Sequence, residues 1–145
     1  MSVLRTTHCE AANPNQLGFL SSGHRGIDIY TAVPYKTNMY YEFIELAPFA
    51  AVRDGLFPED QFLELQWHLC RWPEAGDVIP ETGGCRKIRW KAQGKGKRGG
   101  TRVIYFLRTT VGQIVLVAAY GKNERDDVPR QWLRKLKEHF DEQDK

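Results

Sequence analysis

Residues 85–120 read CRKIRWKAQGKGKRGGTRVIYFLRTTVGQIVLVAAY, and this stretch decides the fold. Three runs rich in β-branched and aromatic residues, at Cys85–Lys91, Arg102–Arg108 and Gln113–Tyr120, predict three strands. The residues from Thr109 to Gly112 predict a hairpin turn between the last two runs. Because connections this short join antiparallel strands, we expect an antiparallel sheet in this half of the chain.

The sequence before this stretch predicts a strand, a short helical turn and a helix. Tyr40–Leu46 combines aromatic and β-branched residues in rough alternation, which favours a strand. Residues 50–56 fit one helical turn. Pro58 stands where the first position of a helix is expected, and the pattern that follows predicts an amphipathic helix ending near Trp72. The apolar stripe of this helix consists of Phe62, Leu65 and Leu69.

A second amphipathic helix is expected from about Asp126 to the end of the chain. Its apolar side is formed by Trp132, Leu133, Leu136 and Phe140. The expected order is therefore strand, helix, three strands and helix. That order predicts an α+β fold with a small antiparallel sheet.

The composition fits one globular domain with an N-terminal extension. The chain has 145 residues, of which 41% are hydrophobic and 27% are charged. We expect residues 1–38 to form a poorly ordered extension and residues 39–145 to form the domain, because the first segment is rich in Ser, Thr, Asn, Gly and Pro. Met39 directly precedes the first expected strand, so a natural start at Met39 is a further hypothesis.

The cysteines and the hydropathy pattern predict a reduced, cytoplasmic compartment. The three cysteines are widely spaced and form neither a disulfide framework nor a zinc motif. No apolar run is long enough to predict a membrane span, and the N-terminus lacks the apolar core of a signal peptide.

Positive charge is concentrated in one segment, although the net charge of the chain is only +3. Eight basic residues and no acidic residue occur between Arg86 and Arg102. Strand alternation places Lys87 and Arg89 on one face, together with Cys85 and Lys91. Arg86, Ile88 and Trp90 then share the other face, and Arg102 can join Lys87 and Arg89 across the strand pair.

This pattern suits a polyanion such as a nucleic acid. Lys and Arg attract phosphates, and they can stabilise the additional negative charge of a pentacoordinate phosphate. Lys87 is also a candidate acid or base because it is surrounded by arginines. Two structural alternatives stay open: a solvated hairpin tip, or lysines that protect an edge strand from aggregation. The histidines and the acidic residues suggest neither histidine catalysis nor a metal-dependent nuclease.

Three motifs resemble the HigB branch of the RelE/ParE toxin superfamily. They are GDVIPxTGGxRKIRW at 76–90, GKGKRGGxRVIY at 94–105 and AYGKNExDD at 119–127. The resemblance covers about residues 40–140 and implies a small twisted antiparallel sheet with helices packed on one side. It also implies a metal-independent, cofactor-free endoribonuclease that cleaves mRNA on the ribosome, as the toxin of a type II toxin-antitoxin system. The implied partners are mRNA, the ribosome and a helix-turn-helix, HigA-like antitoxin, with operator DNA bound only through the antitoxin complex.

The resemblance implies two groups of site residues. The catalytic candidates are Lys87, Arg89, Arg102 and Lys122. The candidates for RNA or ribosome binding are Arg86, Lys91, Lys95, Lys97, Arg98, Tyr120 and Asn123. Asn123 departs from the arginine of the best-known RelE members, and Val128-Pro129 stands where some members carry a tyrosine, so a variant cationic site is expected. A ParE-like gyrase poison and a non-catalytic nucleic-acid-binding protein are the alternatives.

Overall fold

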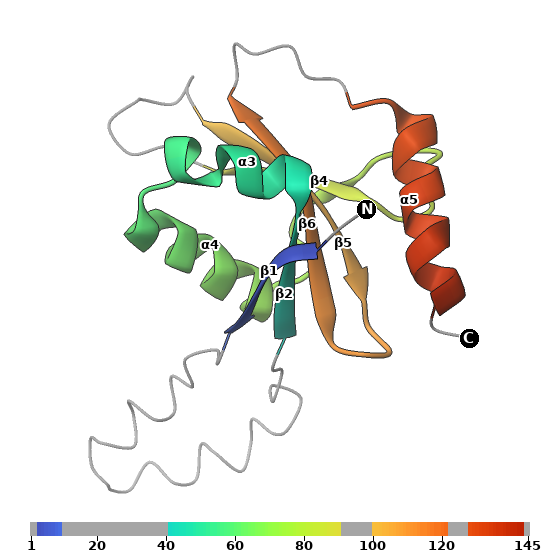
Figure 1. The fold of residues 1–145 in the computed structure, drawn as a ribbon, viewed down its shortest axis with the longest axis horizontal. Helices are drawn as coiled ribbons and strands as arrows, with labels where there is room; N and C mark the ends of the chain where they lie inside the picture. The colour runs from blue at the N-terminus through green and yellow to red at the C-terminus, as the bar shows by residue number, and fades with distance from the viewer. Residues whose placement is uncertain (1–2, 10–40, 91–99, 122–127, 144–145) are drawn as a thin grey trace, which may run out of the picture.

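Six strands form one mixed sheet in the computed structural model, which describes residues 3–9, 41–90, 100–121 and 128–143. The order of strands across the sheet is β1-β2-β6-β5-β4-β3, and helices lie beside it (Figure 1). The elements along the chain are β1 (Val3–Cys9), β2 (Tyr41–Leu46), α3 (Ala47–Leu56), α4 (Glu59–Arg71), β3 (Asp77–Val78), β4 (Arg86–Trp90), β5 (Thr101–Arg108), β6 (Gln113–Gly121) and α5 (Arg130–Gln143). The α+β class expected from the sequence is confirmed.

The strand pairing is antiparallel except between β2 and β6. β4 pairs with β5, and β5 with β6, in the antiparallel arrangement that the short connections predicted. β2 pairs with β6 in parallel, so the sheet is mixed rather than wholly antiparallel. The two helices and three strands between β2 and β6 give the chain enough length to return in the same direction, which a hairpin cannot do.

Helices cover both faces of the sheet, which corrects the expectation that they pack on one side. Buried residues of α3 and α4 join one apolar cluster with Ile114 and Leu116 of β6. Buried residues of α5 join a second cluster with Val115 and Val117, the alternate residues of the same strand. α3 and α4 lie on one side of β4–β6 and α5 lies on the other (Figure 1). Since both faces of β6 are apolar, each requires its own helical cover.

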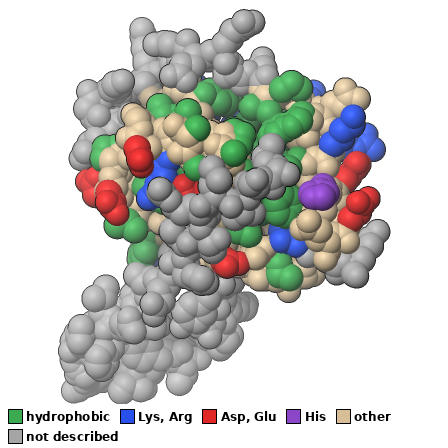
Figure 2. Space-filling view, in the orientation of Figure 1, with side chains coloured by type: hydrophobic (Ala, Val, Ile, Leu, Met, Phe, Trp, Pro, Cys, Tyr) green, Lys and Arg blue, Asp and Glu red, His purple; other side chains and the backbone are tan. Residues whose placement is uncertain are grey.

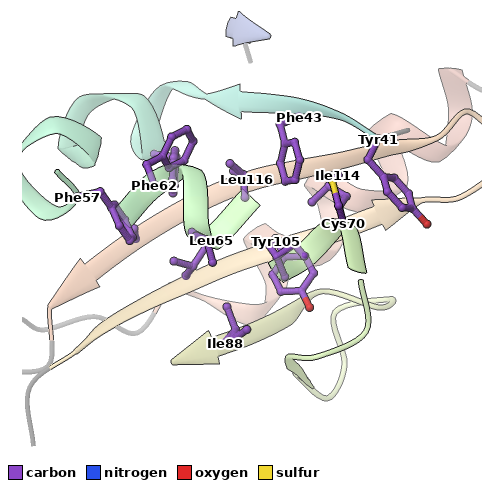
Figure 3. Packing of buried hydrophobic residues seen from close by; sticks show 14 residues of the cluster. Tyr41, Phe43, Phe57, Phe62, Leu65, Cys70, Ile88, Tyr105, Ile114 and Leu116 are labelled. Atoms are coloured by element: carbon purple, nitrogen blue, oxygen red, sulfur yellow. The ribbon is translucent and has the colours of Figure 1, made fainter. Parts of the chain in front are cut away.

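The larger cluster lies between the sheet and the pair α3 and α4 (Figure 3). α3 is longer than the single turn expected, because Pro48 lies in its first turn, where a helix needs no backbone N–H from that residue. Pro58 is the N-cap of α4 rather than its first helical residue. The rings of Phe49, Phe57 and Phe62 pack against one another with centroids 5.9–6.2 Å apart, which joins the two helices.

β1 is a strand in the segment that was expected to be a poorly ordered extension. It pairs with β2 in the antiparallel direction, from Val3 opposite Leu46 to Cys9 opposite Tyr41. The correction concerns these seven residues alone, since residues 10–40 lie outside the described part of the chain. β1 therefore occupies one edge of the sheet and covers an edge of β2 that the domain starting at residue 39 would expose.

The loop before β4 is fixed to α5. The Thr82 hydroxyl donates a hydrogen bond to the Ile79 carbonyl and accepts one from the Cys85 N–H. Cys85 is fully buried beneath α5, and burial raises the pKa of its thiol to about 11. These contacts set where β4 begins and therefore which of its side chains face α5.

Among the described residues, no helix combines the length and the apolar character needed to cross a membrane.

Candidate nucleic-acid interface

Three cations and a tyrosine lie on the α5 side of the sheet, across β4, β5 and β6. Arg89 is directly opposite Arg102, and Arg102 is directly opposite Tyr120. Lys87 is opposite Ile104, which belongs to the α5-side cluster, so Lys87 faces the same way. Lys87 and Arg89 are exposed and Arg102 is half-buried. We call Lys87, Arg89, Arg102 and Tyr120 the cationic face; the structure confirms that Lys87 and Arg89 share a face.

The pairing of Arg89 with Arg102 is unfavourable unless an anion lies nearby. Directly opposite side chains in antiparallel strands have Cβ atoms about 4.5–5.5 Å apart, and like charges there are destabilising. In the described part of the chain, no carboxylate forms an ion pair with either arginine. Nη1 of Arg102 is buried and has no hydrogen-bond partner among the described residues. A buried donor without a partner is unfavourable, and a phosphate oxygen that reached it would supply the missing hydrogen bond.

Two neighbours hold the arginine pair in place. Tyr120 packs against the apolar cluster beneath α5, which supports the β6 side of Arg102. Gly100, with a φ of 134°, directly precedes β5 and lies next to the end of β4. A Cβ at this position would lie 3.0 Å from the Trp90 carbonyl oxygen and 3.6 Å from Cγ of Arg89. Glycine thus permits the close approach of the two strands at the point where the arginines meet.

Arg86 is not part of the cationic face. It lies on the opposite side of β4, where its Nη1 donates to the carbonyl oxygens of Gly76 at 2.8 Å and Glu74 at 3.1 Å. The side chain is 20% exposed and lies 3.9 Å from the Glu74 carboxylate. Arg86 therefore holds the loop before β3, and it is removed from the group of cations that was expected to surround Lys87.

Asp77 is a residue of this region that the sequence analysis did not select. In the β3–β4 pair it is directly opposite Lys87, so its carboxylate is on the same face. The loop reaches β4 because Gly76 has no side chain: a Cβ there would lie 3.0 Å from both the Lys87 carbonyl oxygen and the Tyr105 ring. The Tyr105 hydroxyl accepts a hydrogen bond from the Gly76 N–H and donates one to the Pro73 carbonyl. Only the pairing of a two-residue strand reveals this position, which no sequence periodicity can show.

Several predicted site residues lie outside the described part of the chain. They are Lys91, Lys95, Lys97, Arg98, Lys122 and Asn123. Residues 91–99 connect β4 to β5, and residues 122–127 follow β6. At this end of the sheet, Trp90 of β4 pairs with Thr101 of β5, which pairs with Gly121 of β6. Residues 91–99 and 122–127 therefore both begin at the end of the sheet where Arg89 and Arg102 lie.

The outer surface of α5 has a different electrostatic character. Its cations lie at positions 130–137 and its carboxylates at positions 138–142, and Figure 2 shows basic and acidic side chains next to each other on that side of the molecule. Arg134 pairs with Glu138 at 3.0 Å, and Lys137 pairs with Asp141 at 2.7 Å. Within the described residues, no group of three or more His, Cys, Asp or Glu side chains is arranged to hold a metal ion. Because cations on the outer surface of α5 are paired with carboxylates, positive charge that is unpaired within the described chain distinguishes the cationic face from the α5 surface.

No protein-family model matches the chain. The resemblance to the HigB branch of the RelE/ParE superfamily accordingly stays a prediction that rests on the motifs at 76–90, 94–105 and 119–127.

Proposed function

We propose that this protein is the toxin of a type II toxin-antitoxin module and acts in the cytoplasm as a ribosome-dependent mRNA endoribonuclease. One observation supports the proposal above the others. Arg89, which is exposed, and Arg102, which is half-buried, are opposed on the α5 side of the sheet without a carboxylate partner in the described chain, and Nη1 of Arg102 lacks a hydrogen bond. An RNA phosphate between them relieves the repulsion and satisfies the donor.

The proposed reaction is an internal transesterification. The ribose 2′-oxygen forms a bond to the adjacent phosphorus, and the bond from phosphorus to the 5′-oxygen of the next nucleotide breaks. The products are a 2′,3′-cyclic phosphate and a 5′-hydroxyl, so one proton leaves the 2′-hydroxyl and one reaches the leaving oxygen. Arg89 and Arg102 stabilise the charge that accumulates on the phosphoryl oxygens. In this proposal Lys87, which shares the face with the arginines, transfers a proton, and Tyr120, opposite Arg102, stacks on a base.

Substitution of Arg102 tests this proposal. Induced expression of the wild-type protein without an antitoxin should arrest growth, and primer extension should detect cleavage within translated codons. Arg102→Ala should lower cleavage by about 100-fold or more, since removal of one transition-state donor has effects of that size. Arg134→Ala, which removes the same charge from the surface of α5, should remain fully toxic.

The alternatives give different results in the same cells. A gyrase poison would produce DNA breaks and a DNA-damage response while transcripts stay intact. A non-catalytic nucleic-acid-binding protein would bind RNA with a log–log salt dependence of about −0.7 per phosphate neutralised, without cleaving it. Full toxicity of Arg102→Ala would refute the role assigned to that residue.

A further inference from the structure

Aromatic and cationic side chains gather around the end of α4, on the opposite side of the sheet from the cationic face. Arg71 and Trp72 are exposed, and the others, Trp67, His68 and Trp90, are half-buried. The His68 ring lies between two tryptophans, with its centroid 5.1 Å from that of Trp72 and 5.2 Å from that of Trp90. The Arg71 guanidinium contacts Trp72 as well, 5.1 Å from its ring centroid, and lies 5.6 Å from the centroid of a third tryptophan, Trp67. We call these five residues the aromatic ladder.

Trp72 is the most accessible ring of the ladder and is held in a fixed position. It is 52% exposed, which is unusual for so large an apolar side chain. Its backbone N–H donates to the His68 carbonyl at 2.8 Å, and its backbone carbonyl accepts from the Ala75 N–H at 3.0 Å. These bonds fix the backbone of Trp72, and the contacts of its ring with His68 and Arg71 restrict the side chain, which lowers the entropy lost when a ligand binds.

The ladder has the chemistry that binds nucleobases. Flat aromatic rings and arginine guanidinium planes stack on bases of single strands. Arg71 is exposed and forms no ion pair with a carboxylate in the described chain, so its charge is available to a nucleic acid. Burial lowers the pKa of His68, which favours the neutral ring that fits between the two tryptophans.

The ladder is also continuous with the cationic face. Its last ring, Trp90, ends β4 and directly follows Arg89. β3 covers only Arg86 and Lys87 of β4, so among the described elements no strand lies beside Ile88–Trp90 on that edge. A single-stranded nucleic acid can therefore pass over this edge of β4, from Arg89 and Arg102 on one face of the sheet to Trp90 and Trp72 on the other.

We propose that the aromatic ladder is a stacking subsite for bases of single-stranded RNA that flank the phosphate held at the cationic face. The inference rests on the proposed function for the identity of the nucleic acid. It adds a binding surface on α4, with Trp72 and Arg71 as the residues that contact the bases.

The test measures the binding of an 8-nucleotide 2′-O-methyl oligoadenylate to the full-length protein. The readout is the fluorescence anisotropy of a dye attached to the oligonucleotide. The 2′-O-methyl group removes the nucleophile, so binding is measured without cleavage. Trp72→Leu keeps an apolar side chain but removes the ring, and it should weaken binding by about 10-fold or more. Trp72→Phe should retain most of the affinity, and Arg71→Gln should also weaken binding.

The matched control is Leu63→Ala, which removes an exposed apolar side chain from the same helix outside the ladder and should not change the affinity. Unchanged affinity in Trp72→Leu would overturn the proposal, as would an equal loss in Trp72→Leu and Leu63→Ala, which would indicate a general apolar surface for a protein partner. If Trp72→Leu does not fold, the oligonucleotide affinity of Arg71→Gln decides instead: unchanged affinity in that variant would overturn the proposal. If oligonucleotide binding depends on Trp72 but the protein never cleaves mRNA, the stacking subsite is supported and the proposed endoribonuclease activity is rejected. If the protein cleaves mRNA but binding does not depend on Trp72, the activity is supported and the subsite is rejected.

Discussion

Neighbouring basic residues on β4 have different roles because successive side chains of a strand point to opposite faces. Arg86 donates to two backbone carbonyls on the α4 side, whereas Arg89 is exposed opposite Arg102 on the α5 side. The two residues are identical in type and lie in the same short basic run. Charge density therefore locates the region, but only the face of the strand separates a structural arginine from a candidate functional one.

Arg86→Ala and Arg89→Ala should separate stability from RNA binding. Arg86→Ala should lower the free energy of unfolding by about 1–3 kcal/mol, because two carbonyl groups lose a charged donor. Arg89→Ala should leave stability unchanged or slightly raised, since it removes a repulsion with Arg102, and should weaken RNA binding. Urea unfolding and oligonucleotide anisotropy measure the two effects. Equal loss of stability in both variants would contradict this division of roles.

At the scale of single elements, the sequence predicted most of the structure wherever a regular pattern extended over several residues. β5 and β6 begin and end within one residue of the expected runs, and α4 has the expected apolar stripe. β1 was missed because its seven residues, VLRTTHC, have no bounding turn signals, and their partner strand lies more than thirty residues away. β3 is too short for any period to be visible.

The candidate site was predictable to a similar degree and for a related reason. Alternation alone placed Lys87 and Arg89 together, and the expected strand order placed Arg102 beside them. Alternation also placed Arg86 on the other face, but its hydrogen bonds and the position of Asp77 depend on how the loop at 73–76 folds onto β4, which involves contacts distant in sequence. The aromatic ladder likewise joins the end of α4 to β4 and follows from tertiary packing alone.

The start of β5 should depend on glycine at position 100. Gly100→Ala should lower the free energy of unfolding by about 1–2 kcal/mol, because alanine disfavours a φ of 134° and its Cβ would lie 3.0 Å from the Trp90 carbonyl oxygen. Gly55→Ala is the matched control: a Cβ there meets nothing within 4 Å, and alanine favours the helix by about 0.5–1 kcal/mol. Thermal unfolding of both variants provides the measurement. A Gly100→Ala protein as stable as the wild type would show that β4 and β5 can separate at this end without cost.

At the scale of the whole molecule, the sheet is protected on both faces and at the β2 edge. α3 and α4 cover one face, α5 covers the other, and β1 pairs with β2. The fully buried carboxylate of Glu45 lies within β2, in register with Arg5 of β1 and 3.3 Å from Nη1 of Arg53. A buried charge of this kind is tolerated only when its surroundings stay in place. β1 therefore contributes to the environment of Glu45 as well as to the hydrogen bonds of the sheet.

Removal of residues 1–38 tests whether the domain beginning at Met39 is sufficient. We expect the shortened protein to lose about 2 kcal/mol or more of stability, because the backbone groups of β2 that face β1 lose their partners and water gains access near Glu45. It should also self-associate, since an uncovered edge strand pairs readily with another chain. Urea unfolding and light scattering at several concentrations measure both effects. The cationic face lies across β4, β5 and β6 rather than beside β1, so oligonucleotide affinity should persist at concentrations where the shortened protein stays folded and monomeric. A monomeric shortened protein with full stability would instead show that β1 is dispensable for the fold.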